Sequence, residues 1–162
     1  MDDLSGLYNR KYYHHVISKL TGSPKSKLIT GIMMDANHFK SINDRFGHTT
    51  GDDAIRELGR LISEITTERD MAFRYAGDEF IIISTVEQMQ DAERLVDALQ
   101  QKTAEFNAAS RKPYQLSLAI GYTTCETAEL DFDKFLHQMD MQMYEAKTAY
   151  YLQEGNDRRS GS

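Results

Sequence analysis

The chain has 162 residues, 40% of them hydrophobic, which predicts one compact domain with a single core. Its formal net charge of −6 argues against non-specific nucleic-acid binding, which depends on clustered Lys and Arg side chains, so no nucleic-acid partner is expected. No apolar run is long enough to span a bilayer and no secretory leader is visible, which predicts a cytoplasmic domain.

Apolar periodicity and turn residues predict an α+β order of elements along the chain. Helices are expected over Arg10–Leu20, Phe39–Phe46, Gly51–Thr66, Val86–Ala109 and Phe132–Tyr151. Strands are expected over 28–36 (LITGIMMDA), Met71–Tyr75, Glu79–Ser84 and Gln115–Tyr122. This order favours a mainly antiparallel sheet with helices packed on it.

Turn and linker residues mark the boundaries between these elements. Ala76, Gly77 and Asp78 are expected to form a hairpin between the second and third strands. A type II turn with positive φ at Gly77 would accept Ala76 without strain. The stretch 21–27 (TGSPKSK) indicates a linker. We expect residues 1–152 to form the domain and residues 153–162 a disordered tail.

Acidic residues lie at or just after the ends of two predicted strands. Asp35 lies near the end of a strongly apolar strand, and Asp78 and Glu79 follow the hairpin turn. Such acids are either solvated turn residues or metal ligands at the rim of the sheet. Mg²⁺ takes one or two carboxylates and completes its octahedron with water and substrate phosphate, so two strand-end acids are enough for a site. The local pattern leaves both interpretations open.

Signatures of other metal and phosphate sites are absent from the sequence. An EF-hand loop fails because Phe39 and Lys40 stand where it needs an oxygen ligand and a glycine. The chain has no GxxxxGK[ST], GxGxxG, HExxH or CxxC pattern, and its five histidines lack metal-ligand spacing. The single Cys125 excludes an intrachain disulfide. Lys147, at the edge of an apolar helix stripe, fits either packing of its stem or contact with a phosphate.

Five separated motifs, in order, resemble the GGDEF family of diguanylate cyclases, which condense two GTP into cyclic di-GMP in bacterial signalling. They are DDLSGLYNR (2–10), MDANHFKSINDRFGHTTGDD (34–53), RYAGDEF (74–80), SLAIGY (117–122) and MDMQMYEAK (139–147). The resemblance extends from about Asp2 to Lys147, nearly the whole chain. It implies a fold similar to the palm of nucleotide cyclases and polymerases, with a central, mainly antiparallel five-stranded sheet flanked by helices.

The resemblance also implies a metal centre with catalytic residues. Asp35, Asp78 and the backbone carbonyl of Ala36 would hold Mg²⁺, with Mn²⁺ as an alternative ion. Asp78 would accept the proton of the attacking 3′-hydroxyl, Glu79 would lie beside the metal, and Lys147 would complete the catalytic group.

Substrate contacts follow from the same resemblance. Asn43 and Asp52 would read the guanine edge, since an amide and a carboxylate suit its acceptor and donor groups. Lys40 and Lys147 would face the triphosphate, and the Ala76-Gly77 backbone would approach it. One domain would hold one GTP, so a homodimer is required for catalysis. An N-terminal sensory or regulatory domain is expected outside this chain.

Four positions depart from the family pattern. Ala76 replaces the first signature glycine, and Tyr151 stands where an arginine would face phosphate, which removes one charge-assisted contact. Asn37 replaces the usual second Asp. Thr67 replaces the arginine of the RxxD product-inhibition motif, so that inhibitory site is expected to be absent. These changes keep an alternative open, a degenerate domain that binds GTP as a regulatory module without turnover. A ligand-free structural domain is disfavoured, because all four expected guanine and metal side chains are present.

Overall fold

A computed structural model describes residues 1–21 and 26–160 of the chain. The elements in order are α1 (Arg10–Leu20), β1 (Leu28–Ala36), α2 (Phe39–Phe46), α3 (His48–Ile65), β2 (Asp70–Ala76), β3 (Glu79–Thr85), α4 (Gln90–Ala109), β4 (Leu118–Glu126), the short 3-10 helix η1 (Thr127–Glu129) and α5 (Phe132–Ser160). The predicted α+β class and the helix-flanked antiparallel sheet are confirmed.

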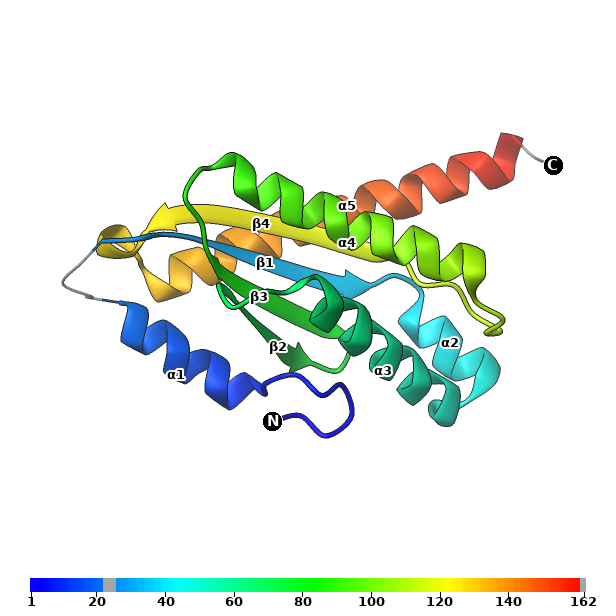
Figure 1. Ribbon diagram of the computed structural model, residues 1–162. Coiled ribbons are helices and arrows are strands. Elements are labelled where there is room, and N and C mark those ends of the chain that lie inside the picture. Colours follow the sequence, from blue (N-terminus) through cyan, green and yellow to red (C-terminus); the bar gives the residue numbers. More distant parts are fainter. Residues whose placement is uncertain (22–25, 161–162) are drawn as a thin grey trace.

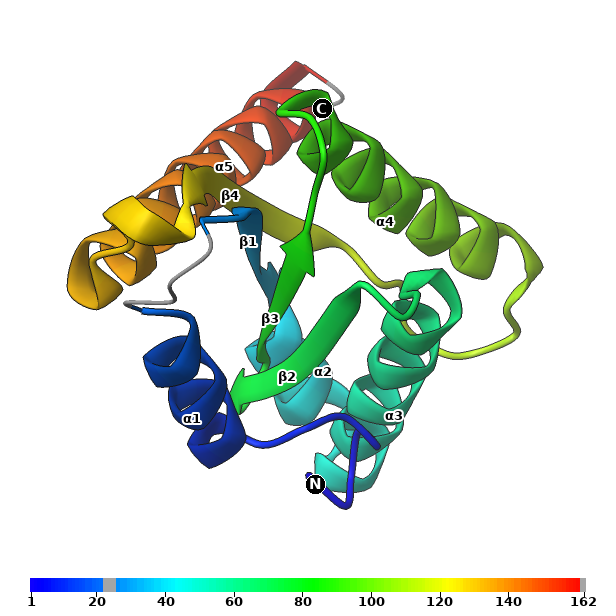
Figure 2. The same cartoon turned by 60° about the vertical axis from the view of Figure 1, so that its left-hand side comes forward.

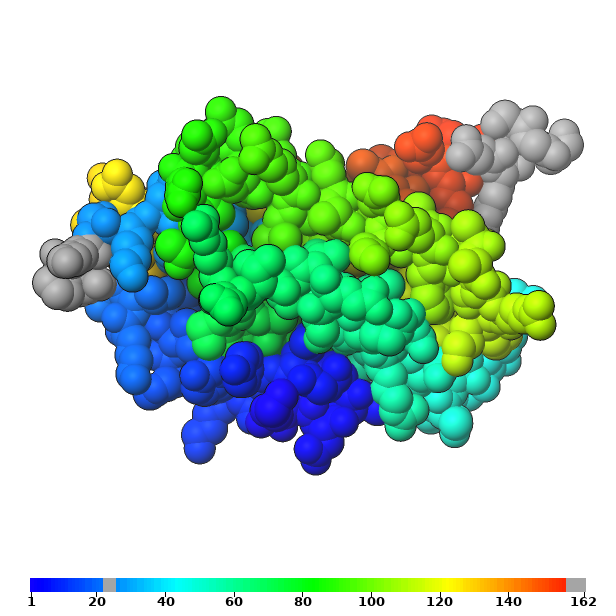
Figure 3. Space-filling model, in the orientation of Figure 1, coloured from blue at the N-terminus to red at the C-terminus, as the bar shows by residue number. Residues whose placement is uncertain are grey.

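The sheet is antiparallel with strand order β2-β3-β1-β4. Helices α1 and α5 cover one face, and α3 and α4 cover the other, while α2 extends from the end of β1 (Figures 1 and 2). Figure 3 shows the α3–α4 side closed by side chains, with the N-terminal residues in blue packed beneath α3. No helix in the described part of the chain combines the length and apolarity needed to cross a membrane.

β1 is the central strand, and its alternating side chains enter both cores. Ile32 and Met34 pack in the cluster beneath α3 and α4, whereas Ile29 and Met33 pack with α1 and α5. Burial on both faces explains why the sequence of β1 is almost continuously apolar, and its predicted bounds are confirmed.

Two glycines set how closely α5 approaches the sheet. A methyl group at Gly31 would meet the sulfur of Met139 and the ring of Phe135, and one at Gly121 would overlap the α5 backbone. The missing side chains let α5 lie directly on β1 and β4. This close approach brings the later residues of α5 to the end of β1, where the candidate site lies.

The expectation of five strands is wrong. Among the described residues the sheet has four, because the chain after Lys147 stays helical and forms no further strand. Tyr150 and Tyr151 continue the helix, and no proline follows to end it. Helix α5 therefore includes residues 153–160, which the sequence had assigned to a disordered tail. Residues 22–25 of the expected linker and 161–162 of the expected tail lie outside the described residues.

The hairpin turn also differs from the prediction. Ala76 pairs with Glu79, so Gly77 and Asp78 form the turn and Ala76 is the last residue of β2. A register shift between Arg74 and Ala76 moves the turn by one position. Neither turn residue has positive φ, so the type II turn with a left-handed Gly77 is wrong. Ala76 brings no backbone strain in this geometry.

Other element boundaries shift where side chains bind backbone groups. Helix α4 begins at Gln90, not Val86, because the Asp91 carboxylate accepts the Glu87 and Gln88 N–H groups and forms a turn ahead of the helix. β4 begins three residues later than predicted. The Asn107 side chain binds both the N–H and the carbonyl of Leu116, which replaces strand pairing there. Helix α3 begins at His48, directly after the Gly47 turn.

Candidate functional site

The predicted acids meet at one end of the sheet. Asp35 lies opposite Glu79 in the β1–β3 register, and the N–H of Ala36 donates to the carbonyl of Asp78 over 3.3 Å. The end of β1 is thus bound to the β2–β3 turn through the backbone. The structure brings Asp35, Asp78 and Glu79 together, as the family resemblance implied.

An N-terminal anchor holds this turn. The Arg74 guanidinium donates to the carbonyl of Gly77 at 2.9 and 3.1 Å and forms an ion pair with Asp2 at 3.2 Å. Asp2 in turn accepts the N–H and the hydroxyl of Ser5, at 2.8 and 2.7 Å. Asp2 and Arg74 lie within the DDLSGLYNR and RYAGDEF motifs, but no role was predicted for either. Together they connect the first residues of the chain to the position of Asp78.

Lys147 reaches the acids from α5. Its Nζ donates to Oδ2 of Asp35 over 3.0 Å, and the Asp35 side chain is only 9% exposed. The other oxygen, Oδ1 of Asp35, is buried without a hydrogen-bond partner among residues 1–21 and 26–160. A buried carboxylate oxygen without a donor is costly unless another group neutralises it, so this atom marks a place for a cation.

Crowding of acids perturbs their protonation. Burial, and next the neighbouring Asp35 carboxyl, raise the pKa of Asp78 to about 7. Burial also raises the pKa of Glu79, and the charges of Asp35 and Asp140 add to the effect. Lys147 alone does not offset this negative charge, as the upward shifts show.

The residues fit a hard divalent cation. The donor set offers the Asp35 and Asp78 carboxylates, with the carbonyl of Ala36 adjacent in the chain, and such oxygen ligands suit Mg²⁺ or Mn²⁺. The described residues contain no group of three or more His, Cys, Asp or Glu placed to hold a metal. Two carboxylates are nevertheless sufficient for Mg²⁺, whose other ligands are water and substrate phosphate.

The predicted guanine residues lie at the junction of α2 and α3. Gly47, with φ of +90°, makes the turn between the helices. A methyl group at Gly51 would overlap Oδ1 of Asn43, so the Asn43 amide packs against Gly51 in the first turn of α3. Asp52 is the next residue of that helix. Asn43 is half-buried and Asp52 is exposed. Both helices thus present a polar group near one junction.

The remaining predicted substrate residues are exposed. Lys40 lies in the first turn of α2, and Ala76 and Gly77 lie at the hairpin tip. Asn37 is buried: its N–H donates to the carbonyl of Ser117 and its amide to the Ser117 hydroxyl, at 2.8 and 3.0 Å. Asn37 therefore ties the end of β1 to the segment before β4.

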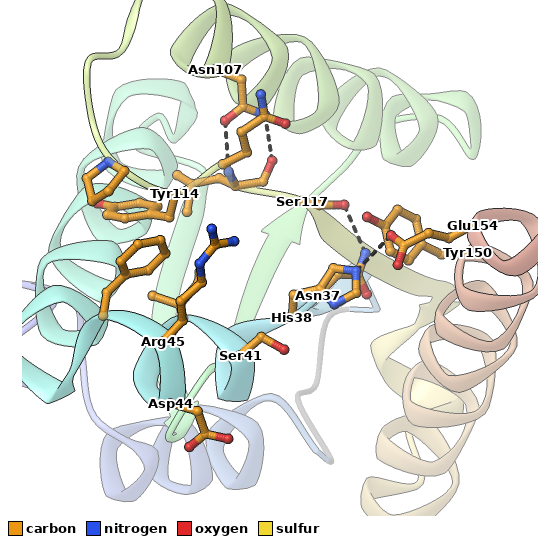
Figure 4. A pocket seen from close by; sticks show the side chains of 15 residues that line it. Asn37, His38, Ser41, Asp44, Arg45, Asn107, Tyr114, Ser117, Tyr150 and Glu154 are labelled. Atoms are coloured by element: carbon orange, nitrogen blue, oxygen red, sulfur yellow. Dashed lines mark hydrogen bonds and ion pairs between the residues drawn. The ribbon is translucent and has the colours of Figure 1, made fainter. Parts of the chain in front are cut away.

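A cavity of about 930 Å³ lies beside α2, apart from the acids. Its labelled lining residues are Asn37, His38, Ser41, Asp44, Arg45, Asn107, Tyr114, Ser117, Tyr150 and Glu154 (Figure 4). Of the residues predicted for metal, guanine and phosphate, none belongs to its described lining. The cavity is thus separate from the carboxylate pair.

Comparison with known proteins places this geometry in a family. The family model "Diguanylate cyclase, GGDEF domain" matches residues 1–151. "Diguanylate cyclase DosC" of Escherichia coli strain K12 is 32% identical over 157 residues, covering 91% of this chain and 33% of that protein. The chain therefore spans about a third of the length of this curated relative.

Solved structures agree on the fold. The isolated GGDEF domain of PA1120 (TpbB or YfiN) from Pseudomonas aeruginosa matches with a TM-score of 0.75 and 26% identity, covering 91% of this chain and 88% of that one. The GGDEF domain of DgcB from Caulobacter crescentus, solved in complex with c-di-GMP, matches with a TM-score of 0.77 and 23% identity, covering 92% and 90%. The family match ends at Tyr151, so the last turns of α5 lie beyond it.

Proposed function

Because the chain belongs to the GGDEF-domain family of diguanylate cyclases, we propose that it condenses two molecules of GTP into cyclic di-GMP. The observation that carries the proposal is the Asp35–Asp78 pair, held beside Lys147 and with one buried Asp35 oxygen left without a partner in the described residues. A similar fold, that of DgcB, was solved with the proposed product.

The proposed metal ligands are the carboxylates of Asp35 and Asp78 and the carbonyl of Ala36, which would hold Mg²⁺ or Mn²⁺. When bound, the ion supplies Lewis-acid polarisation of the α-phosphate and lowers the pKa of the attacking hydroxyl. Asp78 takes the proton that the 3′-hydroxyl loses. Glu79 adds negative charge beside the pair.

Each condensation step forms one bond and breaks one. The 3′-oxygen of one GTP forms a bond to the α-phosphorus of the other, and the bond from that phosphorus to pyrophosphate breaks. Two such events close the ring and release two pyrophosphates. Lys40 and Lys147 face the triphosphate and stabilise the charge of the leaving pyrophosphate, while Asn43 and Asp52 hold the guanine.

The reaction requires two copies of the domain under this proposal. Each domain binds one GTP, and the two must face each other so that each hydroxyl reaches the partner's α-phosphate. The GTP requirement places the domain in the cytosol, with its input from a sensory or regulatory domain elsewhere in the protein.

A second candidate is a regulatory module that binds GTP without turnover. Tyr151 favours it, because a neutral phenol stands where the family places a phosphate-facing arginine and donates its single O–H only. The two candidates share the binding residues and differ in chemistry.

The test is product formation from GTP and Mg²⁺, followed by chromatography with mass detection across a series of protein concentrations. Wild type is expected to yield cyclic di-GMP faster than linearly with concentration, and Asp78→Ala to abolish it. Asp97→Asn, an exposed acid on α4, is the matched control and should retain activity. GTP binding without product at the highest concentration would favour the regulatory module.

A further inference from the structure

The end of α5 is fastened to the start of α2. The backbone N–H of His38 donates to the Tyr151 hydroxyl over 2.9 Å, and Nε2 of His38 lies 2.8 Å from the Glu154 carboxylate. The His38 ring also meets the rings of Tyr151 and Tyr150 edge to face, with centroids 4.9 and 5.6 Å apart. Figure 4 shows the His38 ring facing Glu154 and Tyr150. We call Tyr150, Tyr151 and Glu154 the α5 latch.

Helix spacing explains how the latch is built. Tyr150 and Tyr151 precede Glu154 by four and three residues, so all three side chains fall on one side of α5. His38 has φ of 61°, a left-handed conformation that is strained for a residue with a side chain. Contacts with Tyr150, Tyr151 and Glu154 of α5 hold it there. The latch depends on the helix continuing past Tyr151.

The latch lies against the proposed phosphate contacts. His38 is the N-cap of α2, where backbone N–H groups lack helical acceptors and attract anions. Lys147 lies one helical turn before Tyr151 on α5, so the two side chains fall on the same side of the helix. The Tyr151 hydroxyl oxygen therefore accepts the backbone N–H of His38 close to Lys147, the lysine that is proposed to face the triphosphate.

We propose that the α5 latch is an autoinhibitory contact, in which Tyr151 and Glu154 close the start of α2 against the triphosphate. The hydroxyl oxygen of Tyr151 takes the His38 N–H that a phosphate oxygen would accept, and the Glu154 carboxylate repels the incoming phosphates. Nucleotide binding must displace the latch. This inference rests on the proposed function, since it assumes that GTP is the ligand.

Tyr151 could instead help to bind the nucleotide, and this role predicts the opposite change in affinity. A phenol that accepts one hydrogen bond keeps its own O–H, which would serve as a phosphate donor in place of arginine. In that case removing the hydroxyl weakens nucleotide binding, whereas removing an autoinhibitory contact strengthens it. The sign of the change in affinity separates the two roles.

The experiment measures the affinity of a non-hydrolysable GTP analogue with Mg²⁺ by calorimetry. Tyr151→Phe keeps the ring on His38 and removes only the hydroxyl, and Glu154→Gln keeps the length and removes the charge. We expect binding to become about three- to tenfold tighter in each, the scale of one lost hydrogen bond or charge contact. Tyr144→Phe is the matched control, since Tyr144 is 68% exposed on the same helix, and it should bind as wild type does.

A second measurement reads the latch without nucleotide. Amide exchange at His38, followed by NMR, should be faster in Tyr151→Phe than in wild type, because the N–H loses its acceptor. Unchanged or weaker analogue binding in Tyr151→Phe, with wild type still binding, would overturn the latch alone. Absence of analogue binding in wild type and in all variants would overturn the proposed function and the inhibitory role with it. Unchanged amide exchange at His38 in Tyr151→Phe would refute the hydrogen bond between His38 and Tyr151.

Discussion

Asp35 and Lys147 form an ion pair that uses only one of the two carboxylate oxygens. Nζ of Lys147 lies 3.0 Å from Oδ2 of Asp35, while Oδ1 is buried with no partner in the described part of the chain. The lysine comes from α5 and the acid from the central strand, 112 residues apart in sequence. Gly31 and Gly121 allow this meeting by letting α5 lie close on the sheet. The close packing of α5 on the sheet thus forms a charged site in which one carboxylate oxygen of Asp35 is not neutralised by Lys147.

Removing Lys147 should destabilise the domain most when no divalent ion is present. Lys147→Met leaves the Asp35 carboxylate without its cation, at a cost of about 1–3 kcal/mol in the free energy of unfolding. Mg²⁺ should recover a large part of this loss. Urea unfolding with EDTA and with Mg²⁺ measures both quantities, and Lys134→Met, at an exposed position of α5, should change neither. An equal loss in both buffers would contradict the cation site.

The stability of the domain in EDTA should fall as pH rises from about 4 to 7. The pKa of Asp78 is about 7 in the folded state, above its ordinary value of 3.8, so the folded state binds the proton more tightly. The stability from this proton is present below the ordinary pKa and is lost as pH rises through the folded pKa. Because Asp78 is partly exposed, the expected loss is about 1–2 kcal/mol after solvent screening.

Urea midpoints at pH 4, 5, 6, 7 and 8 measure this slope. Asp78→Asn cannot titrate and should flatten the profile, leaving the smaller contribution of Glu79, whose pKa is also raised. Asp97→Asn should reproduce the wild-type slope. A wild-type stability that falls no more steeply with pH than that of Asp78→Asn would be incompatible with a protonated Asp78 in the folded domain.

The ion pair of Asp2 and Arg74 should be coupled to the hairpin that presents Asp78. Asp2→Asn and Arg74→Gln should each cost about 1–2 kcal/mol, and the double variant should cost less than their sum by about 1 kcal/mol. A double-mutant cycle by urea unfolding measures the coupling. Both variants should also lower product formation, since Arg74→Gln removes the donors to the Gly77 carbonyl and Asp2→Asn removes the ion pair that holds Arg74. Strict additivity would show that Asp2 and Arg74 are not coupled.

Local sequence patterns predicted the strands and the acids well because their causes are local. β1 has the predicted bounds, since a strand buried on both faces is apolar throughout. Asp35 lies at the end of β1 and Asp78 follows β2, so both lie at a rim of the sheet, but the local pattern alone did not show that the two rims coincide. That step came from the family motifs, and the β1–β3 register agrees with it.

Features that depend on distant contacts were missed. No partner was predicted for His38, yet it binds Tyr151 and Glu154 at sequence separations of 113 and 116 residues. The same contacts accompany the continuation of α5 through residues that looked like a tail. β4 begins late because Asn107 occupies the backbone of Leu116. These contacts cannot be predicted from the sequence patterns that indicate helices and strands.

Gly51 should prove necessary for guanine recognition. A methyl group there would overlap the Asn43 amide, so Gly51→Ala forces the amide away from α3 and should weaken binding of the GTP analogue about tenfold, the scale of one lost hydrogen bond to the base. The discrimination between GTP and ATP should fall with it, because the proposed contacts of the Asn43 amide are with the base alone. Gly155→Ala is the matched control: a methyl group at Gly155 meets nothing within 4 Å in the described residues, and alanine there should stabilise the helix by up to about 1 kcal/mol without changing affinity. Calorimetric titrations with both nucleotides decide the matter, and retained GTP preference in Gly51→Ala would remove Asn43 from the guanine site.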